Sequence, residues 1–408
     1  MTNMNLMRQL AKQDGGKIIL LVMDGLGGLP SEGSNQTSLE YASTPNLDRL
    51  AREGCQGLSH PIGRGITPGS GPAHLALFGY DPVTSPVGRG VLSALGVGFD
   101  LKPEDVAARG NFCTVDSDGL ITDRRAGRIS SDRALPLVNK LNRIRVPGVE
   151  TFVRQVKEYR FVLVFRVANL SGALEDTDPQ AVGKAPLTVT TTNNGSDPAA
   201  ENTARLVQNW VDQARSILRD DQPANMVTLR GFGQDPQLQK FADNYRLKSA
   251  CVAVYPMYKG VSRLVGMDIL DTGPDFTPEQ EFDTVSSNWE KYDFFFVHIK
   301  PTDSRGEDGN FEAKAAVIET VDKAVPILTG LDPDVLIVTG DHSTPARLRS
   351  HSWHPVPTLL WAPKSQLADE TIGFGERSGQ SGGLGHFNAT DIMPLAMAHA
   401  LRLEKYGA

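Results

Sequence analysis

The feature of this sequence that most restricts its fold is a series of short apolar runs. Each run is too short for a typical helix, and most begin after a charged or turn residue. Helical patterns with one apolar face lie between some of them, over residues 202–219 and 312–328. This alternation predicts an α/β fold. The runs that we expect to form buried strands are residues 18–23, 162–165, 251–255, 294–299, 335–338 and 358–361.

The chain is longer than one hydrophobic core usually fills. Its 408 residues predict two domains, or one large domain with an insertion. The residues that could take part in catalysis or metal binding lie near the two ends of the chain. The middle third has strand and helix patterns of its own. We therefore predict a core domain from residues 1–100 and 256–408, with an inserted α+β domain at residues 101–255.

Charge and cysteine content restrict the compartment and the partners. A net charge of -7 argues against a broad nucleic-acid surface, although a small anion could still bind to local arginines. The three cysteines are far apart and lack CxxC spacing, which favours a reducing compartment. The first residues lack an apolar signal core, and the run at 18–23 is far too short to span a membrane. We expect a cytoplasmic protein with neither membrane nor nucleic-acid partners, and the sequence is compatible with a homo-oligomer.

Four clusters of metal-ligand residue types stand where predicted strands run out into loops. Loops at the carboxyl ends of strands are where open α/β sheets hold ligands. Carboxylates with a few imidazoles suit Mn²⁺, Zn²⁺ or Mg²⁺, and this many ligands indicates two ions rather than one. Each cluster alone fits an ordinary turn or helix cap, but an Asp-His pair after a buried strand has no obvious packing purpose. The candidate ligands are Asp24, Asp303, Glu307, Asp341, His342 and His351.

Ser70 lies between these clusters, in the Gly-Pro-rich segment TPGSGPAHLALFGYDP. The short apolar stretch after it predicts a helix that begins at or near the serine, which is a good position for an anion. A serine hydroxyl is a weak nucleophile unless a base or a metal ion activates it. An ordinary helix cap is the alternative, and it would be preferred if the metal clusters were absent.

A group of arginines and aspartates occupies the predicted insertion. Arginine binds phosphate and carboxylate groups bidentately, as recognition of a small phosphorylated acid would require. A solvated charged loop explains the same residues equally well, and their types alone leave both interpretations open. The residues are Arg124, Arg125, Arg128, Arg160, Asp176 and Asp178.

Several longer strings of residues carry a family resemblance. They are KIILLVMDGLGG, STPNLDRLAREG, TPGSGPAHLALFGYDP, RGVLSALGVGFDLKPEDVAARGNF, DRRAGRI, TGDHSTP and HSWHPVP. In this order and spacing, from about residue 17 to residue 407, the chain resembles the archaeal-type 2,3-bisphosphoglycerate-independent phosphoglycerate mutases of the alkaline phosphatase superfamily.

The resemblance implies a fold and an activity. The fold is a mixed sheet sandwiched by helices, with a substrate-binding cap inserted after the nucleophile. The activity is that of an isomerase of glycolysis and gluconeogenesis, which interconverts 3-phosphoglycerate and 2-phosphoglycerate through a phosphoserine. The implied cofactors are two divalent ions, with Mn²⁺ favoured and Mg²⁺, Zn²⁺ or Co²⁺ compatible, and 2,3-bisphosphoglycerate is not needed.

The resemblance also assigns roles to residues. Ser70 is the nucleophile. It shares one ion with Asp24, Asp341 and His342, while Asp303, Glu307 and His351 hold the other. The substrate-binding residues are Arg128, Arg160, Asp176 and Asp178 in the cap and Lys259 in the core.

One departure from the family pattern bears on metal choice. Glu307 stands where the family usually has a histidine, four residues after the aspartate. A carboxylate in place of an imidazole favours Mn²⁺ or Mg²⁺ over Zn²⁺. Two other functions remain compatible with the sequence: a metal-dependent phosphatase or phosphonate-related enzyme of the same superfamily, and a degenerate paralogue that only binds a phosphorylated metabolite.

Overall fold

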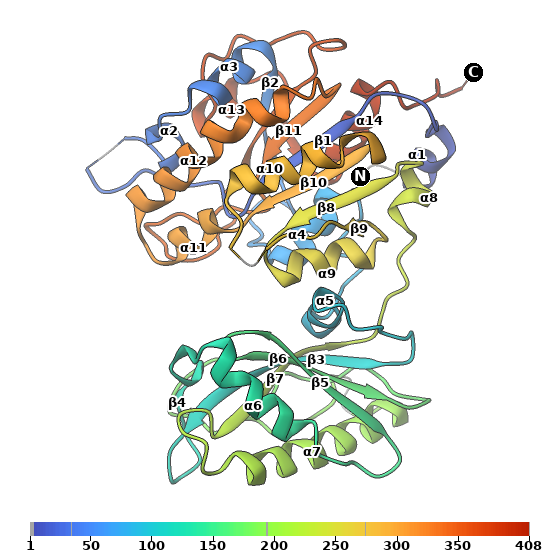
Figure 1. Cartoon of the computed structure of the whole chain (residues 1–408), viewed down its shortest axis with the longest axis vertical. Coiled ribbons are helices and arrows are strands. Elements are labelled where there is room, and N and C mark those ends of the chain that lie inside the picture. The colour runs from blue at the N-terminus through green and yellow to red at the C-terminus, as the bar shows by residue number, and fades with distance from the viewer. Residues whose placement is uncertain (1–3, 34, 193–194, 274, 408) are drawn as a thin grey trace. The chain divides into compact units, whose positions relative to one another are not determined.

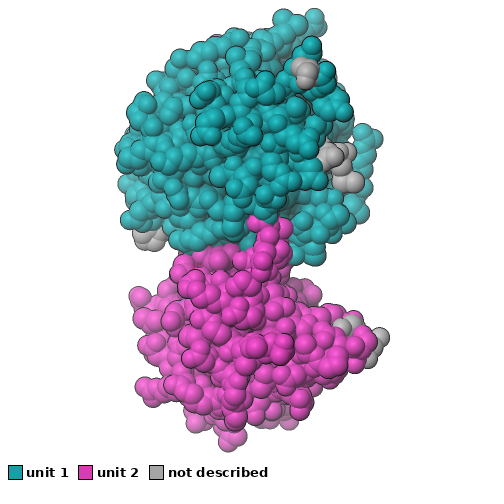
Figure 2. Space-filling view, turned by 90° about the vertical axis from the view of Figure 1, so that its right-hand side faces the viewer, with its two compact units in different colours: residues 1–86, 239–408 teal, residues 87–238 magenta. Residues whose placement is uncertain are grey.

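The structure is a computed structural model that describes residues 4–33, 35–192, 195–273 and 275–407. The chain divides into two compact units, coloured separately in Figure 2. Unit 1 combines Met1–Pro86 with Gln239–Ala408, and unit 2 is Val87–Leu238.

These boundaries differ from the predicted ones at residues 100 and 255. Helix α5 (Arg89–Gly96) belongs to unit 2, because it packs on the sheet of that unit. A Cβ atom at Gly90 would lie 2.2 Å from the carbonyl oxygen of Ala107, so only glycine allows this approach. Strand β8 (Ser249–Ala253) belongs to unit 1, since it pairs with β10 (Phe294–Ile299). Local sequence patterns do not show which sheet a helix or strand joins, so they do not fix these boundaries.

Unit 1 is built on an eight-stranded mixed sheet in the order β13-β2-β12-β11-β1-β10-β8-β9. Strands β11, β1, β10 and β8 are parallel to one another, and β12 runs antiparallel to both β11 and β2. The strands not yet given are β1 (Ile18–Met23), β2 (Cys55–His60), β9 (Asp268–Ile269), β11 (Val335–Thr339), β12 (Val356–Trp361) and β13 (Gly385–Asn388).

Helices lie on both sides of this sheet (Figure 1). Because strand residues alternate between faces, Phe295 and Val297 of β10 pack in the core with α3, α10 and α12, whereas Phe296 and His298 face α4 and α9. The helices of unit 1 are α1 (Met4–Leu10), α2 (Ser38–Tyr41), α3 (Pro45–Glu53), α4 (Ser70–Leu77), α8 (Phe241–Tyr245), α9 (Pro256–Leu264), α10 (Pro278–Ser287), α11 (Pro301–Glu307), α12 (Phe311–Thr329), α13 (Glu376–Ser381) and α14 (Ile392–His399), with 3₁₀ turns at Trp289–Lys291 and Ala389–Asp391.

Unit 2 is an antiparallel sheet in the order β4-β3-β6-β5, with β7 pairing the other edge of β3. Figure 1 shows α6 and α7 on one side of the sheet and α5 on the other. Phe112, Phe161 and Trp210 lie in the core between the sheet and α7. The remaining elements are β3 (Val106–Val115), β4 (Ile121–Asp123), β5 (Glu150–Lys157), β6 (Arg160–Arg166), β7 (Met226–Gly233), α6 (Ser131–Leu141), α7 (Pro198–Leu218) and a 3₁₀ turn at Ala126–Arg128.

The predicted α/β class is confirmed, and each of the six predicted strands coincides or overlaps with an observed one. Strands β1 and β10 have the predicted bounds, and helices α7 and α12 cover the two predicted helical segments almost completely. Within the described residues, no helix combines the length and the apolar character needed to cross a bilayer.

Candidate active site

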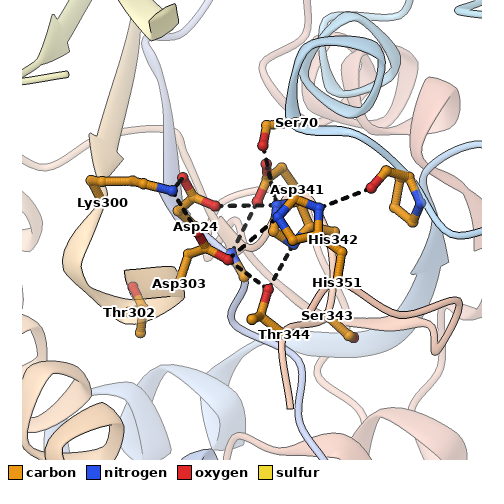
Figure 3. A network of polar contacts seen from close by, with 12 residues as sticks. Asp24, Ser70, Lys300, Thr302, Asp303, Asp341, His342, Ser343, Thr344 and His351 are labelled. Atoms are coloured by element: carbon orange, nitrogen blue, oxygen red, sulfur yellow. Dashed lines mark hydrogen bonds and ion pairs between the residues drawn. The ribbon is translucent and has the colours of Figure 1, made fainter. Parts of the chain in front are cut away.

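Polar side chains gather at one edge of the unit 1 sheet, where three parallel strands end side by side. Asp24 follows β1, Asp303 lies in the first turn of α11 just after β10, and Asp341 and His342 follow β11. Because β1 pairs in parallel with both β10 and β11, the loops after these strands meet, and Figure 3 shows their side chains converging.

Glycines let two of these loops approach each other closely. A Cβ atom at Gly27 would lie 1.9 Å from Ser343 Oγ, so a larger residue is excluded. Gly25 has φ +63°, in the left-handed region that favours glycine, and its amide donates a 3.0 Å hydrogen bond to Asp341 Oδ1. The loop after β1, which contains the DG string, therefore packs directly against the loop after β11, which contains the DHS string.

The first group of potential ligands is Asp24, Asp341 and His342, all fully buried. His342 Nε2 lies 3.3 Å from Asp24 Oδ1 and 3.2 Å from Asp341 Oδ2. Neither carboxylate oxygen accepts a hydrogen bond from any described residue. A divalent ion about 2.1 Å from each donor atom would hold such atoms roughly 3.0 to 3.4 Å apart, so the spacing fits an ion and the ion would satisfy both oxygens.

Hydrogen bonds fix the tautomer of His342. Thr344 Oγ1 lies 2.6 Å from Asp303 Oδ1 and 3.0 Å from His342 Nδ1. The hydroxyl donates to the carboxylate and therefore accepts from Nδ1–H, which leaves the lone pair of Nε2 directed at the two aspartates. An imidazole oriented through its second nitrogen is typical of metal ligands.

Ser70 lies beside this group as the first residue of α4, with Gly69 as the residue before the helix. Its Oγ is 3.4 Å from His342 Nε2. The predicted helix start is therefore confirmed. The N-cap position belongs to Gly69, so Ser70 is the first helical residue rather than the cap, and its hydroxyl faces His342.

The second group is Asp303, His342 and His351. His351 Nε2 lies 3.7 Å from Asp303 Oδ1, and the rings of His342 and His351 stack with centroids 3.6 Å apart. His351 Nδ1 is 3.0 Å from the carbonyl oxygen of Pro68, to which it donates, so its Nε2 also keeps a lone pair. His342 thus belongs to both groups, whereas the resemblance assigned it to one.

Glu307 lies outside these two groups. Its Oε1 is 4.0 Å from His351 Nε2, and its side chain is 57% exposed. The carboxylate therefore lies near the second group without being part of it.

Lys300 is a site residue that sequence patterns missed. Its ammonium is 3.0 Å from Asp24 Oδ2 and 2.5 Å from Asp303 Oδ2, so it joins one carboxylate of each group (Figure 3). Burial would raise the pKa of Asp24, but Lys300, His298 and His342 outweigh it and hold that pKa well below its ordinary value. Lys300 directly follows β10, just as candidate metal ligands follow β1 and β11. This position at the end of a strand is the feature of the sequence that could have identified it.

Buried aromatic and imidazole side chains contact the residues of the first group and Ser70. The hydroxyl of Tyr258 donates a short hydrogen bond to Asp24 Oδ2, and the Tyr258 ring stacks on His298, whose Nε2 is 3.3 Å from the same oxygen. His74, one turn after Ser70, places Nδ1 2.7 Å from the Ser70 carbonyl oxygen. Burial, aided by His298, lowers the pKa of His74 to about 3, so this imidazole is neutral.

The predicted substrate residue Lys259 follows Tyr258 on α9 and therefore points in another direction. It acts electrostatically on Glu281 and Cys251. Lys300, not Lys259, is the lysine bonded to the ligand carboxylates.

The two aspartates predicted to bind substrate in unit 2, Asp176 and Asp178, both bond to arginines. Asp178 is buried and forms a two-bond ion pair with Arg124, with distances of 3.1 and 2.7 Å. Asp176 accepts from Arg230 Nε at 3.2 Å and from the amide of Gly231 at 2.6 Å. Both aspartates are thus engaged in orienting arginines.

Arg128 and Arg160, the two arginines that the resemblance assigns to substrate binding, differ in their surroundings. Arg160 starts β6, lies opposite Asn111 in the pairing with β3, and contacts Glu158 at 2.9 Å. Arg128 is exposed, with φ +52°. Only Arg160 is therefore part of the sheet.

The fold and the two overlapping Asp-His groups define an α/β protein with two sets of potential metal ligands and a serine beside them. The sequence profile of the family described as 2,3-bisphosphoglycerate-independent phosphoglycerate mutase matches residues 51–225. A probable member from Aquifex aeolicus is 46% identical over 99% of this chain and 100% of that relative. The cofactor-independent phosphoglycerate mutase from Thermoplasma acidophilum has 33% identity and a TM-score of 0.69, covering 94% of this chain and 100% of that one. The PH0037 protein from Pyrococcus horikoshii has 30% identity and a TM-score of 0.82, covering 97% and 100%.

This chain belongs to the 2,3-bisphosphoglycerate-independent phosphoglycerate mutase family. The predicted family and its enzyme class, isomerase, are thereby confirmed.

Proposed function

We propose that the protein interconverts 3-phosphoglycerate and 2-phosphoglycerate through a phosphoserine at Ser70. The observation that carries the proposal is the position of Ser70 Oγ, 3.4 Å from His342 Nε2 and beside the unsatisfied oxygens of Asp24 and Asp341. Support also comes from relatives named as probable mutases that match nearly the whole chain.

The reaction balances without a second phosphorylated cofactor. Ser70 Oγ bonds to phosphorus as the bond to O3 of the glycerate breaks, and the proton lost by the serine is matched by the one gained at O3. The glycerate O2 then bonds to phosphorus as the Oγ bond breaks, which restores the serine. The helix start at Ser70 directs backbone amides toward the transferred group and favours its negative charge.

Two divalent ions complete this account, with Mn²⁺ the preferred species. Asp24, Asp341, His342 and Ser70 would hold one, and Asp303, His351 and a rotated Glu307 the other, with His342 close to both. Bound there, such ions lower the pKa of the serine hydroxyl and neutralise charge on the phosphoryl group. The four hard carboxylates of the two sets favour Mn²⁺ or Mg²⁺ over Zn²⁺.

Lys300 is proposed to contact the phosphoryl group. Burial would lower its pKa, but Asp24 and other acidic groups raise it well above the ordinary value, so the side chain stays an ammonium. It is held at the carboxylates of both groups, where a phosphoryl oxygen would replace one of its present bonds. In this role it takes the place that was predicted for Lys259.

Unit 2 is proposed to bind the glycerate carboxylate and hydroxyls. Arg109 and Arg230 are cross-strand partners of β3 and β7. Like charges directly opposite one another are unfavourable unless an anion compensates them. Asp176 and Asp178 both supply such anions to Arg230, and the substrate carboxylate is proposed as a further partner of this arginine. The roles of Arg128 and Arg160 remain predictions within the same proposal.

The test is to incubate the Mn²⁺-loaded protein with 3-phosphoglycerate, without 2,3-bisphosphoglycerate, and to couple formation of 2-phosphoglycerate to enolase. Inorganic phosphate is measured in parallel. Isomerisation with little phosphate release supports the proposal. Release of phosphate alone would instead identify a phosphatase, and absence of both products with Mn²⁺, Mg²⁺, Zn²⁺ and Co²⁺ would leave a protein that only binds the metabolite.

A further inference from the structure

Lys314 is a fully buried lysine on α12, outside every motif that points to the active site. Its Nζ donates to three backbone carbonyl oxygens: Gly25 at 2.7 Å, Gly27 at 3.0 Å and Thr344 at 2.9 Å. An ammonium has three hydrogens and a neutral amine two, so three carbonyl acceptors match the charged form.

These three carbonyls belong to the two loops that carry the first group of ligands. Gly25 directly follows Asp24, and Thr344 lies two residues after His342. The loops also bond to each other, since the Thr344 amide donates to the Gly27 carbonyl at 3.0 Å and the Gly25 amide to Asp341. Lys314 therefore lies where the backbones of both loops converge.

The placement of a charge here needs a compensating benefit. Burying an ammonium is expensive unless strong hydrogen bonds replace those to water. Lys314 has such bonds, but they go to main-chain atoms rather than to a carboxylate, so their effect is to fix backbone positions. The neighbouring residues on α12, Ala315 and Ile318, pack in the ordinary apolar core.

We propose that Lys314 is a positioning residue that holds the loop of Asp24 and the loop of His342 at the separation a divalent ion requires. It touches neither the ion nor the substrate. Its ammonium acts as a fixed internal cation that binds the carbonyls of Gly25, Gly27 and Thr344, so that Asp24 Oδ1 and Asp341 Oδ2 stay 3.3 and 3.2 Å from His342 Nε2 before metal binds. The inference rests on the proposed metal-dependent function, because it concerns the same ligands.

The test compares Mn²⁺ affinity in three proteins: the unaltered chain, Lys314→Met and Lys323→Met. Methionine keeps an unbranched apolar stem, is one atom shorter than lysine and removes the charge, and Lys323 is an exposed residue of the same helix. Free Mn²⁺ is followed by electron paramagnetic resonance during titration, and the thermal unfolding of each metal-free protein is recorded alongside. Lys314→Met is expected to weaken Mn²⁺ binding by about 10- to 100-fold, as loss of a ligand's supporting contacts typically does, while Lys323→Met is unchanged.

Two further measurements separate positioning from simple stabilisation. Lys314→Gln, whose amide can still donate two hydrogen bonds, is expected to bind Mn²⁺ more tightly than Lys314→Met, and it carries the test if the methionine variant does not fold. Lys314→Ala with added n-propylammonium, which replaces the deleted atoms, is expected to regain part of the affinity. The inference is wrong if folded Lys314→Met or Lys314→Gln binds Mn²⁺ as tightly as the unaltered chain. Failure of the unaltered chain itself to bind Mn²⁺ would instead overturn the proposed function.

Discussion

Ser70 Oγ lies 3.4 Å from His342 Nε2, at the point where the start of α4 meets the loop after β11. Two chemistries could follow from this contact. His342 could take the serine proton directly, or its Nε2 could bind an ion that activates the serine. One lone pair cannot do both, so removal of metal distinguishes the two.

We predict that chelation abolishes isomerase activity and that added Mn²⁺ restores it. The unsatisfied oxygens of Asp24 and Asp341 beside Nε2 favour the ion. Activity is measured with the enolase-coupled assay before chelation, after it and after Mn²⁺ is returned. Substantial turnover by protein shown to be free of metal would mean that His342 acts as a general base.

Replacing Lys300 should impair catalysis more than metal binding. Lys300→Met removes the ammonium at Asp24 and Asp303, and loss of one such charge at a transferred group typically lowers turnover by about 10²- to 10³-fold. Mn²⁺ affinity should stay equal or increase, because the ammonium no longer competes for the carboxylates. Lys259→Met is the matched control, and a larger loss of turnover in that variant would restore the original assignment of Lys259.

Glu307→His should change metal preference without disturbing the fold. The side chain is 57% exposed and lies 4.0 Å from His351 Nε2, so an imidazole fits without repacking a core. We expect Zn²⁺ affinity relative to Mn²⁺ to rise by about tenfold or more, measured by competition titration, since imidazole suits Zn²⁺ better than Mn²⁺. Asp308→His, at the exposed neighbouring position, serves as the control. An unchanged ratio would place Glu307 outside the metal site.

Glu281 should make stability depend on pH. Burial raises the pKa of this carboxyl from 4.5 to about 9, with Lys259 opposing the shift. The folded state therefore keeps its proton longer than the unfolded state, so this group lowers stability progressively as pH rises from about 4.5 to about 9. Glu281→Gln should flatten that decline in urea unfolding of the metal-free protein, whereas Glu279→Gln on the exposed face of α10 should not. Parallel pH profiles for the two variants would argue against a buried neutral carboxyl.

Local sequence patterns predicted the parts of this structure that depend on neighbouring residues. The apolar runs of β1 and β10 and the Gly-Ser-Gly helix start at Ser70 are local, and the structure confirms them. Asp24, Asp341 and His342 were predicted as ligands because each follows a strand, although their separation depends on strand order that the sequence does not state.

The missed residues act through distant contacts. Tyr258 and Lys314 reach the ligands or their loops from helices whose patterns suggest only packing, and their partners lie more than two hundred residues away in several cases. The boundaries of the two compact units differ from the predicted domain boundaries for the same reason, since α5 and β8 are assigned by the sheets they join.

The most direct test of the account is detection of phosphate on Ser70. Metal-loaded protein is mixed with 3-phosphoglycerate, quenched in acid and digested with trypsin, and the peptide of residues 65–89 is fragmented to separate Ser70 from Ser85. We predict phosphate on Ser70 in the unaltered chain. In Ser70→Ala we predict no phosphate on this peptide and a turnover reduced by about 10⁴-fold or more. Phosphate on another residue, or near-normal turnover in Ser70→Ala, would contradict the central claim that Ser70 is the nucleophile.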